Sequence, residues 1–361
     1  MIRPLVGVTL AALSVTSLGS DIFFTGVGDL PGGSYYSEAH AVSADGSTVV
    51  GMSKHASQFE REAFRWTLAT GMVGLGALPG LDPVSWANGV SGDGSVVVGD
   101  GAGGAWRWTQ QEGMIALGDL GSDSWSGASG VSADGRVVVG HARTTEYLIE
   151  AFRWTQAAGM VGLGFLPGGS FSGASAASTD GAVIVGVGWS AQYPKGEAFR
   201  WENWQMVGLG ALPGDDHSVG YAVGADGAVV VGTSDSAYSF RAFRWTAAGG
   251  MLDLGGNGAV AVSGDGSIVV GRFAGTPALW FDGGWHDLRD LLVNEYHLDL
   301  SAWYLERATA ISADGKTIVG WGYHYGYGPE GWVAHIPEPG TAALVLLCVL
   351  MGRAPFGRAE K

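Results

Sequence analysis

Residues 41–51 read Ala-Val-Ser-Ala-Asp-Gly-Ser-Thr-Val-Val-Gly, and close copies of this stretch recur six more times along the chain. An Asp-Gly pair between two β-type runs is typical of a tight β-hairpin, because these residues tolerate the positive φ that the turn requires. The seven pairs are 39 to 49 residues apart and begin at Asp45, Asp93, Asp134, Asp180, Asp226, Asp265 and Asp314. A period of this length without a helical pattern indicates the blades of a β-propeller.

Each repeat has room for four strands. In the second repeat we expect them at residues 72–78, 87–91, 95–99 and 105–109. The last of these is aromatic, and it returns as Ala-Phe-Arg-Trp at 63–66, 151–154, 198–201 and 242–245. With a period of two, Phe and Trp point to one face of the sheet and Ala and Arg to the other. The Arg is then placed to stack on a neighbouring Trp or to pair with an acid.

The order of the strands predicts how the ring closes. Residues 23–32 copy the short apolar strand that follows the aromatic strand in other repeats, and the last repeat ends on its aromatic-type strand near Trp332. The N-terminal strand therefore completes the last blade and leaves no open edge. The predicted fold is all-β, a seven-bladed β-propeller of four-stranded antiparallel blades spanning residues 21–336.

Composition agrees with many short strands joined by glycine turns. The 361 residues include 63 Gly and 15 Trp, and only 15% are charged. The net charge of −15 and the lack of a basic run in the body of the chain argue against a nucleic-acid partner. The one cysteine, Cys348, lies in a C-terminal apolar stretch, so the repeats have neither a disulfide framework nor a cysteine-based metal site.

The N-terminal segment has the order of a secretory signal. Arg3 precedes the apolar run 5–13, and small residues follow at 17–20. We expect residues 1–20 to be a removable signal peptide. A first buried strand or a retained anchor is the alternative, although the apolar run is shorter than the roughly 18 residues that span a bilayer.

The C-terminal segment, residues 337–361, begins with Pro337, Glu338 and Pro339, continues through an apolar stretch at 341–352 and ends with Arg353, Arg358 and Lys361. It resembles the PEP-CTERM sorting signal. That resemblance implies an exosortase-type sorting enzyme as a partner, transient membrane contact through the tail, and a secreted or cell-envelope location in a Gram-negative bacterium. A plain C-terminal anchor is the alternative.

The repeats themselves resemble the HAF repeat of extracellular proteins. In that family Ala-Phe-Arg-Trp and Val-x-Gly-Leu-Gly-x-Leu-Pro-Gly segments alternate with Val-Ser-x-Asp-Gly, and the likeness extends over residues 22–336. It implies export and no defined activity.

Aromatic residues gather in the loops opposite the Asp-Gly hairpins. Variable loops on one rim of a rigid ring are typical of a binding surface, and flat rings with polar tips suit sugars or protein surfaces. The alternative is that these rings fill gaps between blades. The candidate ligand-binding residues are Tyr323, His324, Tyr325, Tyr327, Tyr193, Tyr147 and Trp125.

No catalytic or cofactor motif is present in the sequence, so we assign no catalytic residues, no cofactor and no metal. Each hairpin Asp is followed by Gly rather than by a calcium-type acidic series, so we expect it to cap its own turn. Carboxylates from separate blades can still meet, and Glu150, Glu197, Asp215 and Glu306 are the candidates for such a pair.

The sequence thus favours an exported, non-enzymatic binding or structural propeller of the cell envelope or extracellular matrix, with an extracellular polysaccharide or surface protein as ligand. A secreted carbohydrate-active enzyme on the same scaffold is the alternative. An anchored protein-interaction module is a third possibility.

Overall fold

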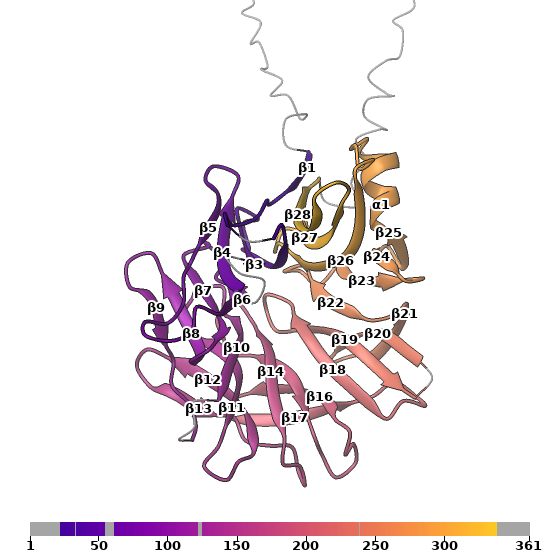
Figure 1. Ribbon diagram of the computed structural model, residues 1–361. Coiled ribbons are helices and arrows are strands. Elements are labelled where there is room, and N and C mark those ends of the chain that lie inside the picture. The colour runs from indigo at the N-terminus through magenta and orange to yellow at the C-terminus, as the bar shows by residue number, and fades with distance from the viewer. Residues whose placement is uncertain (1–21, 33, 55–60, 122–124, 238, 338–361) are drawn as a thin grey trace, which may run out of the picture.

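Seven four-stranded antiparallel sheets are arranged as blades around a ring (Figure 1). The computed structural model describes residues 22–32, 34–54, 61–121, 125–237 and 239–337. This architecture confirms the predicted seven-bladed propeller. The signal segment 1–20 lies outside the described residues, and so does the tail from Glu338 onward, including Pro339.

The strands share one order in every blade, from the ring centre outward. The innermost strands are β2 (Ser37–Val42), β6 (Ser85–Val90), β10 (Ser126–Val131), β14 (Ser172–Ala177), β18 (His217–Val223), β22 (Ala259–Val262) and β26 (Trp303–Ile311). The second strands are β3 (Thr48–Lys54), β7 (Val96–Gly101), β11 (Val138–Arg143), β15 (Ile184–Gly188), β19 (Val229–Ser236), β23 (Val269–Phe273) and β27 (Thr317–His324).

The third strands carry the aromatic motif and the outermost strands are the shortest. The third strands are β4 (Arg61–Thr67), β8 (Gly104–Thr109), β12 (Ile149–Thr155), β16 (Glu197–Glu202), β20 (Ser239–Thr246), β24 (Thr276–Phe281) and β28 (Gly328–His335). The outermost are β5 (Gly71–Gly74), β9 (Gly113–Ala116), β13 (Gly159–Gly162), β17 (Gln205–Gly210), β21 (Gly250–Gly255), β25 (Gly284–Asp287) and β1 (Phe23–Gly26). We number the blades 1 to 7 from their innermost strands, β2 to β26.

The N-terminal strand closes the ring, as predicted. β1 pairs antiparallel with β28 as the outermost strand of blade 7, with Phe23 opposite His335. The side chain of Phe24 packs on Trp303 and Trp332, at ring-centroid distances of 5.2 and 5.9 Å. Blade 7 is therefore built from both ends of the repeat region.

The outermost strand of blade 1 is shorter than the sequence pattern indicates. β5 ends at Gly74, whereas the apolar stretch continues to Leu78. Gly76 has φ of +76°, a conformation that favours glycine, and it turns the chain away from the sheet. Leu78 is then buried in the cluster between blades 1 and 2, beside Ala87 and Trp106. Its apolar character serves packing between blades rather than pairing within one.

A repeated hydrogen-bond junction joins each of five blades to the next. In blade 2, Ser85 Oγ accepts from the backbone N–H of Ala63 in blade 1 and donates to the carbonyl of Gly76, at 2.9 and 2.6 Å. Glu62 completes the junction, because its carboxylate accepts from the Gly76 N–H at 2.9 Å. The equivalent serines are Ser37, Ser126, Ser172 and Ser218.

The arginine of the Ala-Phe-Arg-Trp motif, which reads Ala-Trp-Arg-Trp at residues 105–108, stacks on no tryptophan within the described residues. Arg107 and Arg200 pair with Glu112 and Glu202, each at 2.8 Å, so the expected pairing with an acid is confirmed at these two positions. Arg200 also donates from Nε to the carbonyl of Gly227 in the next hairpin. The arginine thus links neighbouring blades through a backbone carbonyl, which the sequence pattern does not show.

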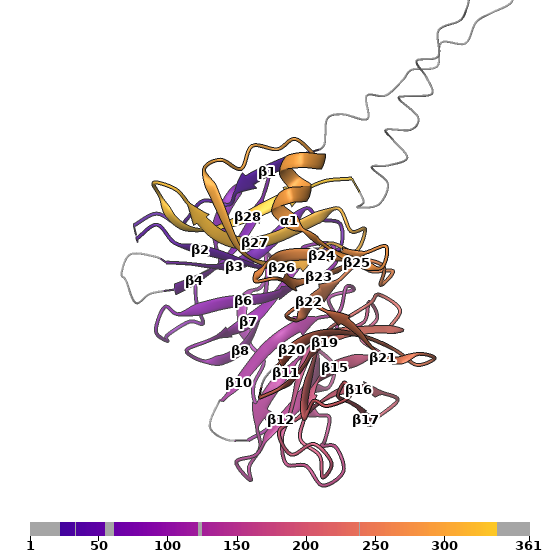
Figure 2. The same cartoon turned by 90° about the vertical axis from the view of Figure 1, so that its right-hand side faces the viewer.

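The strand directions give the ring two distinct faces (Figure 2). The Asp-Gly hairpins lie on one, here called the hairpin face, and the second-to-third-strand loops and blade crossovers lie on the other, the loop face. β28 runs toward the hairpin face and β1 starts there, so both described chain ends leave from that side of blade 7. The helical segments α1 (Leu288–Asp290) and η1 (Leu291–Glu295) lie between blades 6 and 7, and no helix in the described part is long enough to cross a membrane.

Candidate functional site

The central channel is narrow and apolar at the hairpin face. A cavity of about 200 Å³ is ringed there by one β-branched or small residue from each innermost strand, such as Val42, Val90 and Ile311. Backbone hydrogen bonds run from blade to blade around this ring, for example from the Gly92 N–H to the carbonyl of Ala133 at 2.8 Å. This end of the channel holds the blades together and offers few polar side chains.

Toward the loop face, polar side chains of blade 1 replace the apolar ring. Glu38 lies on β2 and accepts a short hydrogen bond from the Tyr36 hydroxyl. His40 contacts the same carboxylate at 3.3 Å, and its Nδ1 lies 2.9 Å from the carbonyl of Ala87 in blade 2. Burial raises the pKa of Glu38, but the hydrogen bonds from His40 and Tyr36 outweigh it, so the pKa lies below its ordinary value. Glu38 is therefore ionised at neutral pH.

Blades 2 and 3 bring a second carboxylate and a second histidine next to these groups. Asn88 Nδ2 donates to Asp100 at 2.6 Å and to the carbonyl of Ala128 in blade 3 at 3.0 Å. A Cβ at Gly127 would lie 3.1 Å from the ring of His141 and 3.7 Å from Asp100, so these two side chains meet over that glycine. Burial raises the pKa of Asp100 and lowers that of His141.

Aromatic rings border the polar groups in blades 2 and 3. The Trp125 ring, with 39% of the residue exposed, lies 5.2 Å from the His141 ring, and the Arg143 guanidinium lies 4.9 Å from the centroid of the same indole. In blade 2, Trp86 has the Arg61 guanidinium 5.9 Å from its ring centroid. Both indoles are thus held by a cation beside the polar groups.

Blade 7 adds a further ring. Tyr323 is 44% exposed and packs 6.3 Å from Trp321, measured between ring centroids. It is also close enough to Tyr36 to help raise the pKa of that hydroxyl, although burial and the hydrogen bond to Glu38 contribute more. The aromatic border therefore continues from blade 7 into blade 1.

These groups form one continuous surface on the loop-face side of the channel, contributed by blades 7, 1, 2 and 3. We call it the mouth cluster. It combines flat rings with hydrogen-bonding groups of both kinds, an arrangement suited to a polar ligand with apolar faces. Its members are Tyr36, Glu38, His40, Trp86, Asn88, Asp100, Trp125, His141 and Tyr323.

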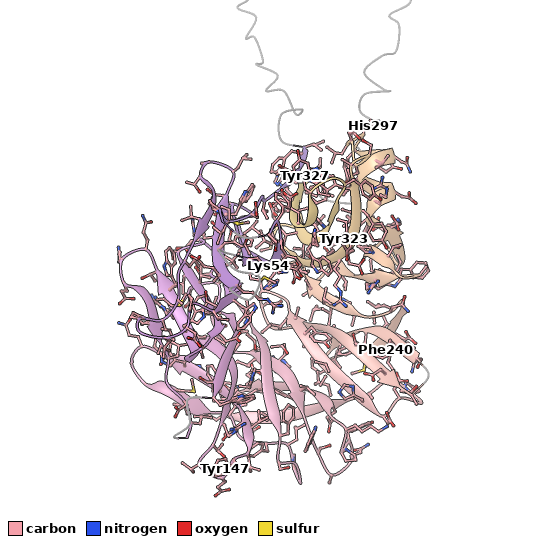
Figure 3. All side chains as sticks on the ribbon, viewed as in Figure 1. Lys54, Tyr147, Phe240, His297, Tyr323 and Tyr327 are labelled. Atoms are coloured by element: carbon pink, nitrogen blue, oxygen red, sulfur yellow. The ribbon has the colours of Figure 1, made fainter. Side chains whose placement is uncertain are left out.

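The candidate residues from the sequence fall into separate places. Tyr323 and Trp125 belong to the mouth cluster. Tyr147 is 76% exposed in the turn between β11 and β12, at the periphery of the ring and distant from Tyr323 (Figure 3). Tyr193 lines a pocket of about 300 Å³ with Lys195 and Asp216.

The other three candidates lie on or beside the β27–β28 connection. Tyr325 and Tyr327 are exposed there. His324 instead packs inward: its Nδ1 lies 2.7 Å from Glu330, and its ring stacks 4.5 Å from Trp303 and 4.5 Å from Tyr327. Glu330 accepts in turn from the Gly28 N–H at 2.9 Å, on the way from β1 to blade 1, so His324 supports the junction between blades 7 and 1.

Sequence reasoning did not single out Glu38, His40, Asn88, Asp100 and His141. A signal exists in retrospect: in blades 1 and 2 the innermost strand carries His40 and Asn88 where blades 3 and 4 have serine. Blade 5 has Tyr221 at the same position, so large polar groups there mark the blades that differ chemically.

Three of the four carboxylates considered for a cross-blade catalytic pair serve the scaffold. Glu150 and Glu197 accept from the backbone N–H groups of Gly164 and Gly210, at 2.7 and 2.8 Å, as Glu62 does in blade 1. Asp215 is buried and pairs with Arg241 at 2.8 Å. The fourth candidate, Glu306, lies on β26 in blade 7.

The hairpin aspartates cap their own turns, as expected. Asp93 Oδ1 accepts from Ser91 Oγ at 2.7 Å and from the Ser95 N–H at 3.0 Å. These hydrogen bonds lower the pKa of Asp93. Among the residues that the structure describes, no group of three or more His, Cys, Asp or Glu side chains is placed to hold a metal ion.

No protein-family model matches the sequence. No curated protein matches it either. Solved structures do share its fold. An oligogalacturonate lyase from Vibrio parahaemolyticus is 9% identical with a TM-score of 0.57, covering 88% of this chain and 94% of that one.

The β-propeller domain of the Trilobed protease from Pyrococcus furiosus is 12% identical with a TM-score of 0.52, covering 83% of this chain and 95% of that one. TolB from Acinetobacter baumannii is 15% identical with a TM-score of 0.43 over 59% of this chain, which spans about half of that protein's length (52%). At these identities the likeness extends to the propeller fold alone. The Pyrococcus domain is described as having an open velcro topology, whereas β1 closes the ring here.

Proposed function

We propose that this protein is an exported, non-enzymatic binding propeller of the cell envelope or extracellular matrix that holds a glycan at its mouth cluster. One observation carries the proposal. Four consecutive blades place exposed or half-buried rings and hydrogen-bonding side chains side by side, at the end of the channel away from the apolar ring of the described part. Sugar rings present apolar faces and polar edges, which this combination matches.

Export and sorting rest on the sequences at the two ends, and the fold supports their use. Phe23 and His335 are paired at the hairpin face, so an attachment through either end holds that face toward its support. The mouth cluster then points away, toward ligands outside. Signal-peptide removal and sorting by an exosortase-type enzyme together predict that protein recovered from its host lacks about 20 N-terminal and about 25 C-terminal residues, as intact-mass analysis measures. Recovery of the full-length chain contradicts this part of the proposal.

Binding is tested on an array of bacterial surface glycans with the Trp125→Ala variant. We expect binding to fall at least about tenfold, because stacking on an exposed indole contributes much of the affinity of a sugar site. Trp204→Ala is the matched control, since Trp204 is a 70% exposed indole in the β16–β17 turn on the hairpin face, opposite the cluster. If both variants bind glycans as tightly as the parent protein, the mouth cluster is not the glycan-binding site. If the protein binds surface proteins but no glycan, the ligand is a protein and not a glycan.

A second candidate function, a secreted carbohydrate-active enzyme, is favoured by one specific observation. The pKa of Asp100 is raised by burial and that of Glu38 is lowered by its hydrogen bonds, and His40 interacts with both carboxylates. Two carboxylates with pKa values shifted in opposite directions are typical of an acid and base pair. If the parent protein cleaves a glycan, and Asp100→Asn abolishes cleavage but still binds the glycan, the protein is an enzyme. Binding without any product by the parent protein rejects it.

A further inference from the structure

The arginines of the Ala-Phe-Arg-Trp motif are not equivalent in their partners. Arg65, Arg200 and Arg244 donate from Nε to the carbonyls of glycines in the following hairpin, at 3.2 to 3.3 Å. Arg107 pairs with Glu112 on the surface. Arg153 has no hydrogen bond or ion pair within the described residues. A guanidinium has five donors, so Arg153 is available to a ligand.

Arg153 lines a groove on the hairpin face. The groove has a volume of about 660 Å³ and lies across blades 2 to 4, with Arg107, Arg136, Asp134 and Asp180 also in its walls. An adjoining groove of about 650 Å³ is lined by Arg65, Asp93 and Arg107. The two share Val96 and Arg107, so they form one track, here called the arginine track.

The track is rich in arginine on a strongly acidic protein. Its walls hold four arginines, Arg65, Arg107, Arg136 and Arg153, against three aspartates, and Glu112 pairs with Arg107, so the track is close to neutral whereas the whole chain has a net charge of −15. Asp93 and Asp180 stay ionised, because hydrogen bonds within their own turns lower the pKa of both. Each hairpin aspartate still has a second carboxylate oxygen, which can accept a hydrogen bond from a sugar hydroxyl.

We propose that the arginine track binds a linear acidic polysaccharide, with a sugar carboxylate on Arg153 and ring hydroxyls on the hairpin aspartates. A carboxylate matches the planar fork of a guanidinium. The recurrence of arginine from blade to blade suits a polymer that repeats its charge. A free phosphate fits less well, because it brings no sugar hydroxyls for Asp134 and Asp180 and its larger negative charge is repelled more strongly by both.

The test measures alginate binding by titration calorimetry at low salt for the parent protein, Arg153→Gln and Lys316→Gln. Lys316 is the matched control, because its substitution removes the same charge from the same face at blade 7, outside the track. Arg153→Gln is expected to weaken binding about tenfold or more, the loss typical of one charge-assisted hydrogen bond, and Lys316→Gln by less than about twofold. Melting curves show whether each variant is folded. If Arg153→Gln is unfolded, the test is repeated with Arg136→Gln, which changes an 84% exposed side chain of the track.

Three results overturn the proposal. If Arg153→Gln binds alginate as tightly as the parent protein, Arg153 is not part of the site. If Arg153→Gln and Lys316→Gln lose the same amount of affinity, the attraction is unspecific. Polyglutamate binding as tightly as alginate shows that hydroxyls play no part. Retention of alginate binding by Trp125→Ala separates this site from the mouth cluster, so that either proposal can fail alone.

Discussion

Two aspartates of blade 2 show how position alone sets the chemistry of a residue type. Asp93 caps an exposed hairpin and its pKa is lowered by hydrogen bonds from Ser95 and Ser91. Asp100 lies further along, in β7 and near the channel, where burial raises its pKa. Both occur in the same short stretch of sequence, and only their depth in the ring distinguishes them.

The two shifts predict opposite effects of removing the charge. An ionised Asp100 destabilises the fold above the pKa of the unfolded chain, about 3.8, so Asp100→Asn is expected to raise the melting temperature at pH 7 and to lose this gain as the pH falls toward 3.8. Asp93 stabilises the fold above that same pH, so Asp93→Asn is expected to lower the melting temperature at pH 7 and to do so less below pH 3.8.

Melting curves of both variants between about pH 3 and pH 8 check these signs. In the Asp100→Asn variant, Asn88 can still donate to the side-chain oxygen of the new amide, so packing is retained and the comparison isolates charge. A lower melting temperature for Asp100→Asn at pH 7 contradicts the burial argument.

Among the secondary-structure elements, the Asp-Gly hairpin depends on space as well as on backbone conformation. Gly94 and Gly118 both have positive φ, +71° and +82°. A Cβ at Gly94 would lie 2.2 Å from Thr48 Oγ1 of the neighbouring blade, whereas a Cβ at Gly118 meets nothing within 4 Å. The hairpin glycine is therefore also a contact point between blades.

This difference predicts unequal losses of stability. Gly118→Ala is expected to lower the free energy of unfolding by about 1 kcal/mol through backbone strain alone. Gly94→Ala adds displacement of Thr48, and we expect a loss of at least about 2 kcal/mol. Denaturant unfolding of the two variants measures the difference, and equal losses show that the neighbouring blade yields without penalty.

The complete ring is held closed by a strand of four residues. β1 contributes Phe24 to the largest buried cluster, between Trp303 and Trp332, together with residues of η1 and β28. Its ladder with β28 joins the first described strand to the last. Closure thus depends on a segment that, in an open chain, would be a frayed terminus.

Weakening this strand is expected to destabilise the entire ring. Phe24→Ala removes a half-buried aromatic side chain and is predicted to lower the free energy of unfolding by about 2 kcal/mol, whereas Ile22→Ala, at an exposed position, changes it by less than about 0.5 kcal/mol. Calorimetric melting measures both. A loss confined to blade 7, seen as a separate low-temperature transition, contradicts cooperative closure.

Local patterns in the chain were enough to predict the blade count, the strand order, the closure by residues 23–32 and the capping role of the hairpin aspartates. Hairpin turns and alternating apolar residues are local features that repeat with a visible period, so no long-range contact has to be known.

Which side chains meet depends instead on how the blades pack. His40, Asp100 and His141 are 41 to 101 residues apart in the chain and come together because three blades converge on one channel. Arg153 shares its motif with Arg65, yet packing between blades leaves the Arg153 guanidinium without a hydrogen bond in the described part and the Arg65 guanidinium bonded to a carbonyl. Identical local sequence therefore acquires different chemistry, because the partners of each side chain come from distant parts of the chain.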